Sequence, residues 1–240
     1  MLLESAVLSG GFESYTRLVW LFTLVITFLM LLLCYLYLTM RKAREKEYFN
    51  FSFSNLMIEG QEAERRRISR ELHDTILPLV RENEVSELIR SICIDLMPPD
   101  FARLSLKNLF AQLCVQFSKR SNLSCACSID NDLDFSRISP ENQLHLYRMV
   151  QEAFTNMEKH SGAASASFVA RRYLDNILIC VSDDGVGLFN FSEADEGLGM
   201  RSIRQRAAIL GAKIDFISEI GNGLMVRIEI NPALTEASVG

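Results

Sequence analysis

Two adjacent residues, His73 and Asp74, carry side chains that together suit nucleophilic chemistry. They end the run from Glu64 to Asp74, which contains no Gly or Pro and therefore favours a helix. Apolar or small residues at spacings of three and four predict one packing stripe along this helix: Ile68, Leu72, Thr75, Ile76 and Leu79. At about 100° per residue, the His73 side chain points away from that stripe. Asp74 could accept a ring proton and leave the other nitrogen free to attack. An exposed histidine on a charged helix is the alternative interpretation.

A second set of polar residues shares one face of a helix expected over residues 143–160. Glu152, Asn156 and Lys159 are four and three residues apart and form a row. A carboxylate, an amide and an ammonium group in one row could hold a magnesium ion and phosphate oxygens. The alternative is a solvated helix face with an ion pair.

A carboxylate followed by alternate glycines comes after an expected strand. The Asp183 carboxylate could accept a hydrogen bond from an exocyclic amine such as that of adenine. Gly185 and Gly187 would let the backbone approach a flat ligand. Asp-Gly is also a common turn, so this segment is weak evidence when taken alone.

Two further glycine pairs follow. Gly197 and Gly199 open an expected helix, and a glycine loop at a helix N-terminus is suited to binding phosphate. Gly221 and Gly223 precede the last expected strand, where a simple hairpin turn would also use them.

The elements that would position these residues alternate between helix and strand beyond Pro99. We expect helices over residues 104–119, 143–160 and 200–210, and strands over 123–129, 166–171, 177–181, 213–218 and 224–230. This mixture predicts an α+β fold, a two-layer sandwich.

The segment before Pro99 predicts an antiparallel helical hairpin. The His73 helix is expected to run to about Leu79, a turn to lie at residues 81–84, and a helix to return over 85–96 and stop at Pro98-Pro99. Such a hairpin would bury its apolar stripe best by dimerising into four helices.

The run from Leu18 to Met40 contains no charged residue and predicts a transmembrane helix about 34 Å long. Four basic residues follow it within residues 41–46, against Arg17 alone before it, so the C-terminal part is expected in the cytoplasm. A signal peptide and a buried helix of a soluble protein are the alternatives. Residues 43–60 are expected to form a connector that is interrupted at Gly60.

Net charge and cysteine spacing argue against a nucleic-acid-binding protein and a zinc protein. The net charge of −5 over 240 residues argues against a nucleic-acid-binding surface. The six cysteines include no Cys-x-x-Cys pair, and with three scattered histidines they show no zinc-site spacing. We interpret all six as reduced, in a cytoplasmic or membrane-embedded setting.

The order and spacing of the motifs resemble the ATP-binding domain of bacterial sensor histidine kinases. That domain has the GHKL (Bergerat) fold, shared with the Hsp90 chaperone, DNA gyrase and MutL. The matching motifs are Glu152-x-x-x-Asn156-x-x-Lys159-His160, Asp183-x-Gly185-x-Gly187, Gly197-x-Gly199 and Gly221-x-Gly223. The run from Glu64 to Asp74 looks like the phosphoacceptor motif of the nitrate-sensor subfamily, and residues 89–105 are similar to its linker.

The resemblance implies a homodimeric enzyme of a two-component system. It would transfer the γ-phosphoryl group of ATP to His73, and then to an aspartate of a response regulator that usually carries a helix-turn-helix DNA-binding domain. Asn156 would hold Mg²⁺ with support from Glu152, and Asp183 would recognise adenine. The phosphates would face Lys159, His160 and the helix start at Gly197–Gly199, and residues 188–196 would form a short lid.

These inferences predict a division of the chain into six parts. They are a short extracytoplasmic N-terminus (1–17), a transmembrane helix (18–40), a juxtamembrane linker (41–60), a dimerisation and histidine phosphoacceptor hairpin (61–100), an ATP-binding catalytic domain (101–232) and a tail (233–240). The outer segment is too short for a sensory domain, so we expect the input to arrive through the membrane helix or a partner protein.

The sequence departs from the family at the hairpin. Only 25 positions separate His73 from Pro98, whereas helices of the subfamily usually run longer. Pro78 stands where the subfamily often has a glutamine, which predicts weak phosphatase activity toward the regulator because proline cannot orient a water. The competing hypothesis is a degenerate, membrane-tethered ATP-binding scaffold without kinase activity.

Overall fold

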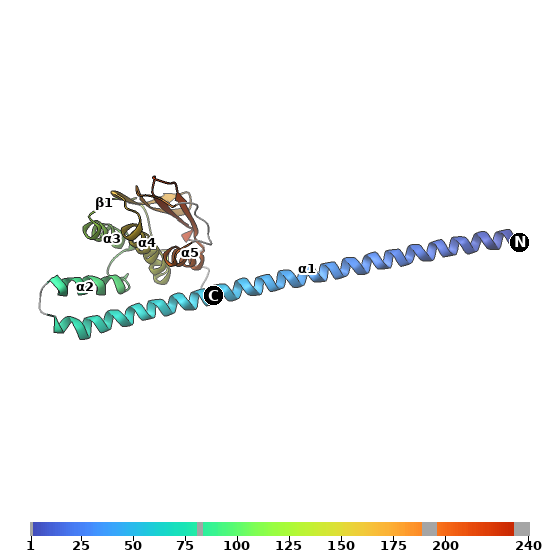
Figure 1. Ribbon diagram of the computed structural model, residues 1–240, viewed down its shortest axis with the longest axis horizontal. Coiled ribbons are helices and arrows are strands. Elements are labelled where there is room, and N and C mark those ends of the chain that lie inside the picture. Colours follow the sequence, from blue (N-terminus) through green and yellow to red (C-terminus); the bar gives the residue numbers. More distant parts are fainter. Residues whose placement is uncertain (1, 81–83, 189–195, 233–240) are drawn as a thin grey trace. The chain divides into compact units, whose positions relative to one another are not determined.

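The computed structural model describes residues 2–80, 84–188 and 196–232. The chain divides into two compact units, Met1–Leu56 and Met57–Gly240. Helix α1 (Leu2–Glu71) fills the first unit and continues into the second (Figure 1). Gly60 lies inside this helix, so the predicted interruption there is wrong. A single glycine costs a helix only about 1 kcal/mol, which the helix-favouring residues on both sides offset.

The first unit contains the one described helix that is long and apolar enough to cross a membrane. Its large apolar side chains between Leu18 and Met40 are exposed, with Trp20 at 75%. The alternative of a buried helix in a soluble core is therefore not what the structure describes. A membrane span and a signal sequence near an N-terminus both have this length and composition.

In the second unit, the helical path changes its geometry around Pro78. A π-helical turn covers Leu72–Ile76 and a 3₁₀ turn covers Leu77–Leu79. Proline has no N–H and its ring collides with the carbonyl one turn earlier, so a regular α-helix cannot continue through this position. Helix α2 (Glu84–Leu96) then returns, as predicted; the expected turn at residues 81–84 lies almost entirely outside the described residues.

The face of α1 that is buried in the second unit differs from the predicted stripe. Ile58, Glu62 and Ser69 are buried. The predicted stripe continues into the turns after α1, where Ile76 is 39% exposed and Leu79 80% exposed. One chain therefore leaves much of the predicted apolar stripe uncovered.

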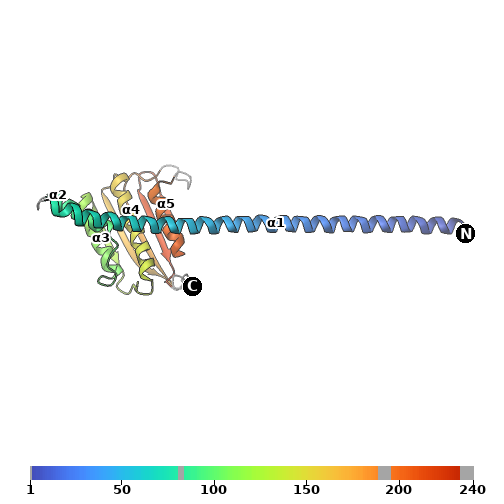
Figure 2. The same ribbon diagram turned by 90° about the horizontal axis from the view of Figure 1, so that it is seen from below.

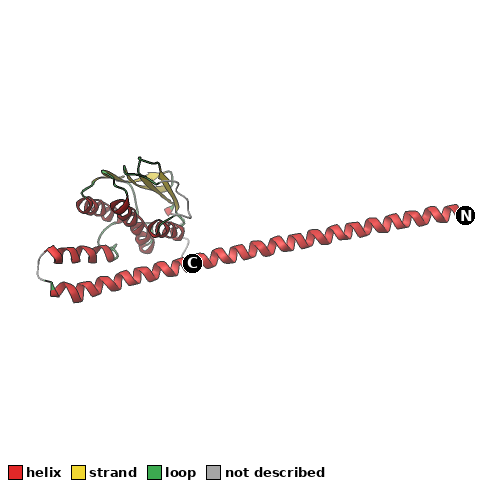
Figure 3. Ribbon diagram, viewed as in Figure 1, coloured by secondary structure: helices red, strands yellow, loops and turns green. Residues whose placement is uncertain are grey.

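The remaining elements form a five-stranded sheet with helices on one face (Figures 2 and 3). In chain order they are α3 (Leu106–Ser121), β1 (Ser124–Ile129), α4 (Pro140–His160), β2 (Ser165–Tyr173), β3 (Asn176–Asp183), α5 (Leu198–Leu210), β4 (Lys213–Ser218) and β5 (Leu224–Ile230). The strand order is β1-β2-β3-β5-β4; β1 and β2 are parallel and the other pairs are antiparallel. This confirms the predicted two-layer α/β sandwich.

Local signals in the sequence set the helix boundaries. Ser105 and Ser139 cap α3 and α4 by accepting hydrogen bonds from backbone N–H groups three residues later. Pro140 occupies the first turn of α4, where its missing N–H is not needed. Gly211 ends α5 in the left-handed conformation.

Aromatic side chains fill the core between the helices and the sheet. Phe110, Phe117, Phe154 and Phe168 are almost completely buried. The rings of Phe117 on α3 and Phe154 on α4 stack with their centroids 4.6 Å apart. This packing fixes α4 against the sheet, and α4 carries the row of Glu152, Asn156 and Lys159.

Candidate functional site

A cavity of about 500 Å³ lies where the end of α4, the end of β3 and the start of α5 meet. Eight of the nine predicted ATP-binding residues line it: Glu152, Asn156, Lys159, His160, Asp183, Gly187, Gly197 and Gly199. Met157, Leu188, Leu198, Met200 and Leu224 add apolar surface. Three segments far apart in the sequence thus converge on one site, while most of the expected lid at residues 188–196 lies outside the described residues.

The start of α5 lies directly against the polar row of α4. A Cβ atom on Gly199 would stand 2.4 Å from Glu152 Oε1 and 2.8 Å from Asn156 Oδ1, so a larger residue here would displace these two side chains. Gly197 caps α5 without a side-chain hydrogen bond. The first N–H groups of α5 are therefore available to an anion, and the helix dipole favours one.

Glu152 and Asn156 offer one carboxylate and one amide oxygen as metal ligands. Among the described residues, no group of three or more His, Cys, Asp or Glu side chains could hold an ion by itself. Mg²⁺ keeps several waters and commonly takes its remaining ligands from substrate phosphates. Glu152 and Asn156 therefore fit an ion whose other ligands are waters and phosphate oxygens.

Asp183 presents a partly desolvated carboxylate to the cavity. The residue is 9% exposed, and its Oδ1 accepts a hydrogen bond from the Gly185 N–H at 2.9 Å. Burial raises the pKa of Asp183, and the backbone N–H groups of Gly185 and Leu224 offset this only in part. A carboxylate with few solvent partners is suited to accept a hydrogen bond from a ligand amine.

Gly185 is the predicted ATP-binding residue that does not line the cavity. A Cβ atom on it would lie 2.2 Å from the Ser161 carbonyl oxygen, where the end of α4 meets the end of β3. Gly223 serves the same purpose on the other side, because its Cβ would lie 1.9 Å from the Asp183 carbonyl oxygen. Both glycines allow the close backbone packing that fixes Asp183.

His73 is exposed, with 66% of its side chain accessible, and it is not among the residues that line the cavity. Its Nδ1 lies 3.0 Å from Asp74 Oδ1, as the adjacent carboxylate predicted. This contact leaves Nε2 directed away from Asp74. The structure thus brings His73 and Asp74 together, but it does not bring them to the cavity.

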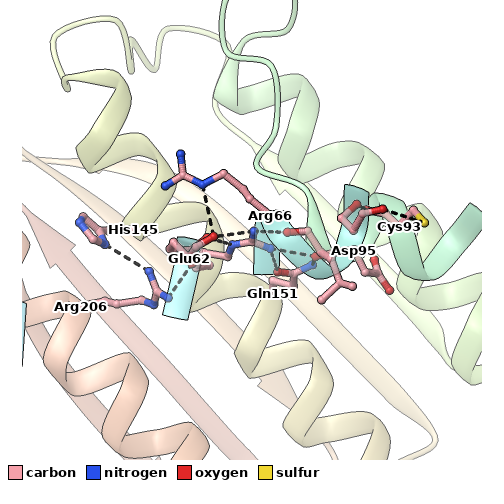
Figure 4. A network of polar contacts seen from close by, with 10 residues as sticks. Glu62, Arg66, Cys93, Asp95, His145, Gln151 and Arg206 are labelled. Atoms are coloured by element: carbon pink, nitrogen blue, oxygen red, sulfur yellow. Dashed lines mark hydrogen bonds and ion pairs between the residues drawn. The ribbon is translucent and has the colours of Figure 1, made fainter. Parts of the chain in front are cut away.

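Sequence reasoning missed a buried polar cluster centred on Glu62, Arg148 and Arg206. Figure 4 shows Glu62 and Arg206 in this cluster. The available signal was Arg148, which directly precedes Met149 and Val150 on the buried face of α4. A charge next to a buried apolar stripe needs a partner. The partner could not be identified from spacing, because Glu62 lies 86 residues earlier in the chain.

No protein-family model matches the chain. The chain is 31% identical over 207 residues to the sensor histidine kinase LnrJ of Bacillus subtilis, covering 74% of this chain and 50% of LnrJ. It is 27% identical over 219 residues to the oxygen sensor histidine kinase NreB of Staphylococcus carnosus, covering 78% of this chain and 62% of NreB.

Among solved structures, the histidine kinase domain of the Erythrobacter litoralis EL346 blue-light activated histidine kinase aligns with a TM-score of 0.52 at 16% identity. The alignment covers 72% of this chain and 99% of that domain. The chain spans 62% of NreB and half of LnrJ, so it corresponds to only part of each of these relatives. The chain is similar in sequence to sensor histidine kinases, and its second unit has the fold of a histidine kinase domain.

Proposed function

We propose that this protein is a membrane-anchored sensor histidine kinase that phosphorylates His73 from ATP. The phosphoryl group then passes to an aspartate of a cytoplasmic response regulator. The observation that carries the proposal is the convergence of eight residues from three segments on one cavity, in a chain that also carries an exposed histidine bonded to a carboxylate.

Different residues of the cavity bind different parts of ATP. Asp183 accepts a hydrogen bond from the adenine amine, and the N–H groups at the start of α5 face the phosphates together with Lys159 and His160. Asn156, supported by Glu152, would hold Mg²⁺, which would neutralise phosphate charge when it is bound. Positioning and charge neutralisation supply most of the catalysis in phosphoryl transfer.

At His73, the contact with Asp74 supports a separate role for each ring nitrogen. Asp74 accepts the Nδ1–H hydrogen bond, so the Nε2 lone pair is free to attack the γ-phosphorus. The Nε2–P bond forms as the bond from the γ-phosphorus to the ADP oxygen breaks. Asp74 stabilises the positive charge that develops on the imidazole ring.

The proposed kinase function also fits the predicted parts of the chain. The helix over residues 18–40 anchors the protein in a bacterial cytoplasmic membrane as a single span. Residues 41–60 link this helix to a dimerising hairpin at 61–100, and residues 101–232 form the catalytic domain. The regulator would carry a helix-turn-helix domain, as in the nitrate-sensor subfamily. Pro78 gives the kinase weak or absent phosphatase activity toward it.

The decisive experiment incubates the membrane-inserted chain with γ-labelled ATP and Mg²⁺. The label should be acid-labile and base-stable, as expected of phosphohistidine. His73→Gln should abolish it while nucleotide binding persists. Labelling that survives in this variant would contradict the assignment of His73. A parent chain that binds ATP but takes up no label would favour the degenerate scaffold, which the short hairpin also suggests.

A further inference from the structure

The carboxylate of Glu62 on α1 is buried between two arginines of the catalytic domain (Figure 4). Its Oε2 accepts hydrogen bonds from Arg148 Nε at 3.2 Å and from Arg148 Nη2 at 3.1 Å. Its Oε1 accepts one from Arg206 Nη2 at 2.8 Å. The side chains of all three residues are 4% exposed or less. The helix that leads to His73 is therefore tied to both α4 and α5.

Glu62 is the carboxylate that compensates both guanidinium groups. Burial alone would raise the pKa of Glu62, but Arg148 and Arg206 outweigh it and hold that pKa below its ordinary value. The neighbouring His145 adds no charge, because burial and Arg206 lower its pKa to about 4. Loss of the Glu62 charge would leave two buried cations without their shared counterion, which is strongly unfavourable.

The other contacts of Arg148 also connect separate elements. Its Nη1 donates to the Asp95 carbonyl at 2.9 Å, and its Nη2 donates to the Leu96 carbonyl at 2.9 Å. Arg148 thus holds the last residues of α2 as well as Glu62 of α1. Arg148 is therefore a single side chain of the catalytic domain that contacts both helices of the hairpin, beside the contacts of Arg206 with Glu62 and of Arg120 with Asp95.

Such a contact is suited to forming and breaking. A buried ion pair adds little net stability compared with apolar packing, but its geometry is specific. Polar surfaces between parts of a chain are typical of parts that move relative to one another. On separation, Glu62, Arg148 and Arg206 would all become solvated, so the open arrangement carries no unpaired buried charge.

The arrangement held by this cluster does not place His73 at the nucleotide site. His73 follows Glu62 by about three helical turns, or roughly 16 Å along the helix axis, and it is not part of the cavity lining. Phosphoryl transfer needs the reacting atoms about 3–3.5 Å apart. The cluster nevertheless acts on the walls of that site, since α4 carries Asn156 and the first turn of α5 contains Gly199.

We propose that Glu62, Arg148 and Arg206 form a latch that holds the catalytic domain on the His73 helix in a resting state. This inference rests on the proposed kinase function. Release of the latch frees α4 and α5 from α1, so that a nucleotide in the cavity can reach a His73 side chain. A signal that turns or shifts α1 would act first on this contact.

The test compares Glu62→Gln with Glu59→Gln in the full chain inserted in lipid nanodiscs. Glu59 lies on the same helix but is exposed, which makes it the matched control. Undocking is measured without ATP, by mass spectrometry of the rate at which phenylglyoxal modifies Arg148 and Arg206. Arg103 is an internal standard because its side chain is 85% exposed. Autophosphorylation of His73 is measured on the same samples.

We expect Glu62→Gln to raise the modification rate of both arginines by about tenfold or more, because a buried pair that loses one charge is strongly disfavoured. The initial rate of His73 phosphorylation should rise with it, and Glu59→Gln should change neither rate.

Unchanged protection of Arg148 and Arg206 would overturn the latch. Exposed arginines with slower phosphorylation would show that docking supports catalysis, and would overturn the resting-state role. Absence of phosphohistidine in the parent as well would overturn the proposed function, while the arginine rates would still decide whether Glu62 holds the two parts together.

Discussion

Two adjacent carboxylates at the end of β3 have different environments. Asp183 faces the cavity and keeps few partners, whereas Asp184 accepts hydrogen bonds from the backbone N–H groups of Ala164 and Ser165, each at 2.8 Å. These bonds, with that from the Ser165 hydroxyl, lower the pKa of Asp184, while burial raises the pKa of Asp183. Asp184 therefore stabilises the start of β2 by hydrogen bonds, and Asp183 remains available to a ligand.

This difference predicts separate effects of two matched substitutions. Asp183→Asn should weaken binding of Mg-ATP by about tenfold or more, since a hydrogen bond to a charged group is worth about 1.5–3 kcal/mol. Asp184→Asn should leave the affinity nearly unchanged but lower the melting temperature by a few degrees. Calorimetric titration and thermal unfolding of both variants measure the two effects. Equal losses of affinity would contradict the assignment of Asp183 as the ligand residue.

The environment of His145 predicts that the stability of the second unit depends on pH. Its Nδ1 lies 3.2 Å from Arg206 Nη1, and burial followed by the Arg206 charge lowers its pKa to about 4, against an ordinary value of 6.5. The unfolded chain therefore binds the proton more readily between these two values. Stability is fully present above about pH 6.5 and is lost as the pH falls toward 4, with a slope of up to about 1.4 kcal/mol per pH unit.

Urea unfolding between pH 7 and pH 4 measures this slope. Glu62 also faces Arg206, but its own pKa is lowered, so its contribution is lost only below the ordinary carboxyl range. His145→Gln should flatten the upper part of the profile, between about pH 6.5 and 5. A variant with the same slope as the parent in that interval would assign the pH dependence to other groups.

At the scale of elements, the sequence predicted the strands and the cavity better than the packing of α1. Hydrophobic alternation predicted β4 and β5 with their observed bounds. The spacing of Glu152, Asn156 and Lys159 predicted the row of side chains that lines the cavity. These patterns are local, so they can be recognised without the fold. The buried face of α1 depends on Arg206, which lies 144 residues from Glu62.

The continuity of α1 through Gly60 predicts a stabilising substitution. Gly60 is exposed, and a Cβ atom there would meet no atom within 4 Å. Gly60→Ala should therefore raise the free energy of unfolding by about 0.5–1 kcal/mol, because alanine restricts the unfolded chain without strain in the helix. Urea unfolding of residues 57–240 gives the value. Gly60→Ala that is neutral or destabilising would mean that the helix is broken at this position, as the sequence had suggested.

At the scale of the whole molecule, the hairpin exposes an apolar face that one chain does not cover. On α2, Ser86 and Cys93 are buried, whereas Val85, Leu88 and Ile92 on other sides are between 40% and 60% exposed. Ile76 and Leu79 of the preceding segment are also exposed. Contiguous exposed apolar side chains of this kind mark an interaction surface, and two such hairpins would form a four-helix bundle.

Leu88 lies at the middle of the apolar residues of α2, so Leu88→Glu should convert residues 57–240 from a dimer to a monomer. Burying its side chain in a dimer would contribute about 1.5–3 kcal/mol per chain, and a carboxylate at the same place would add an unpaired buried charge. Sedimentation equilibrium over a range of concentrations measures the dissociation constant, which should rise by about a hundredfold or more. Glu87→Gln is the matched control, because that side chain is 72% exposed and should leave the constant unchanged. A Leu88→Glu variant that still dimerises as tightly as the parent would place the dimer contact elsewhere, and the exposed face of α2 would then need a different partner.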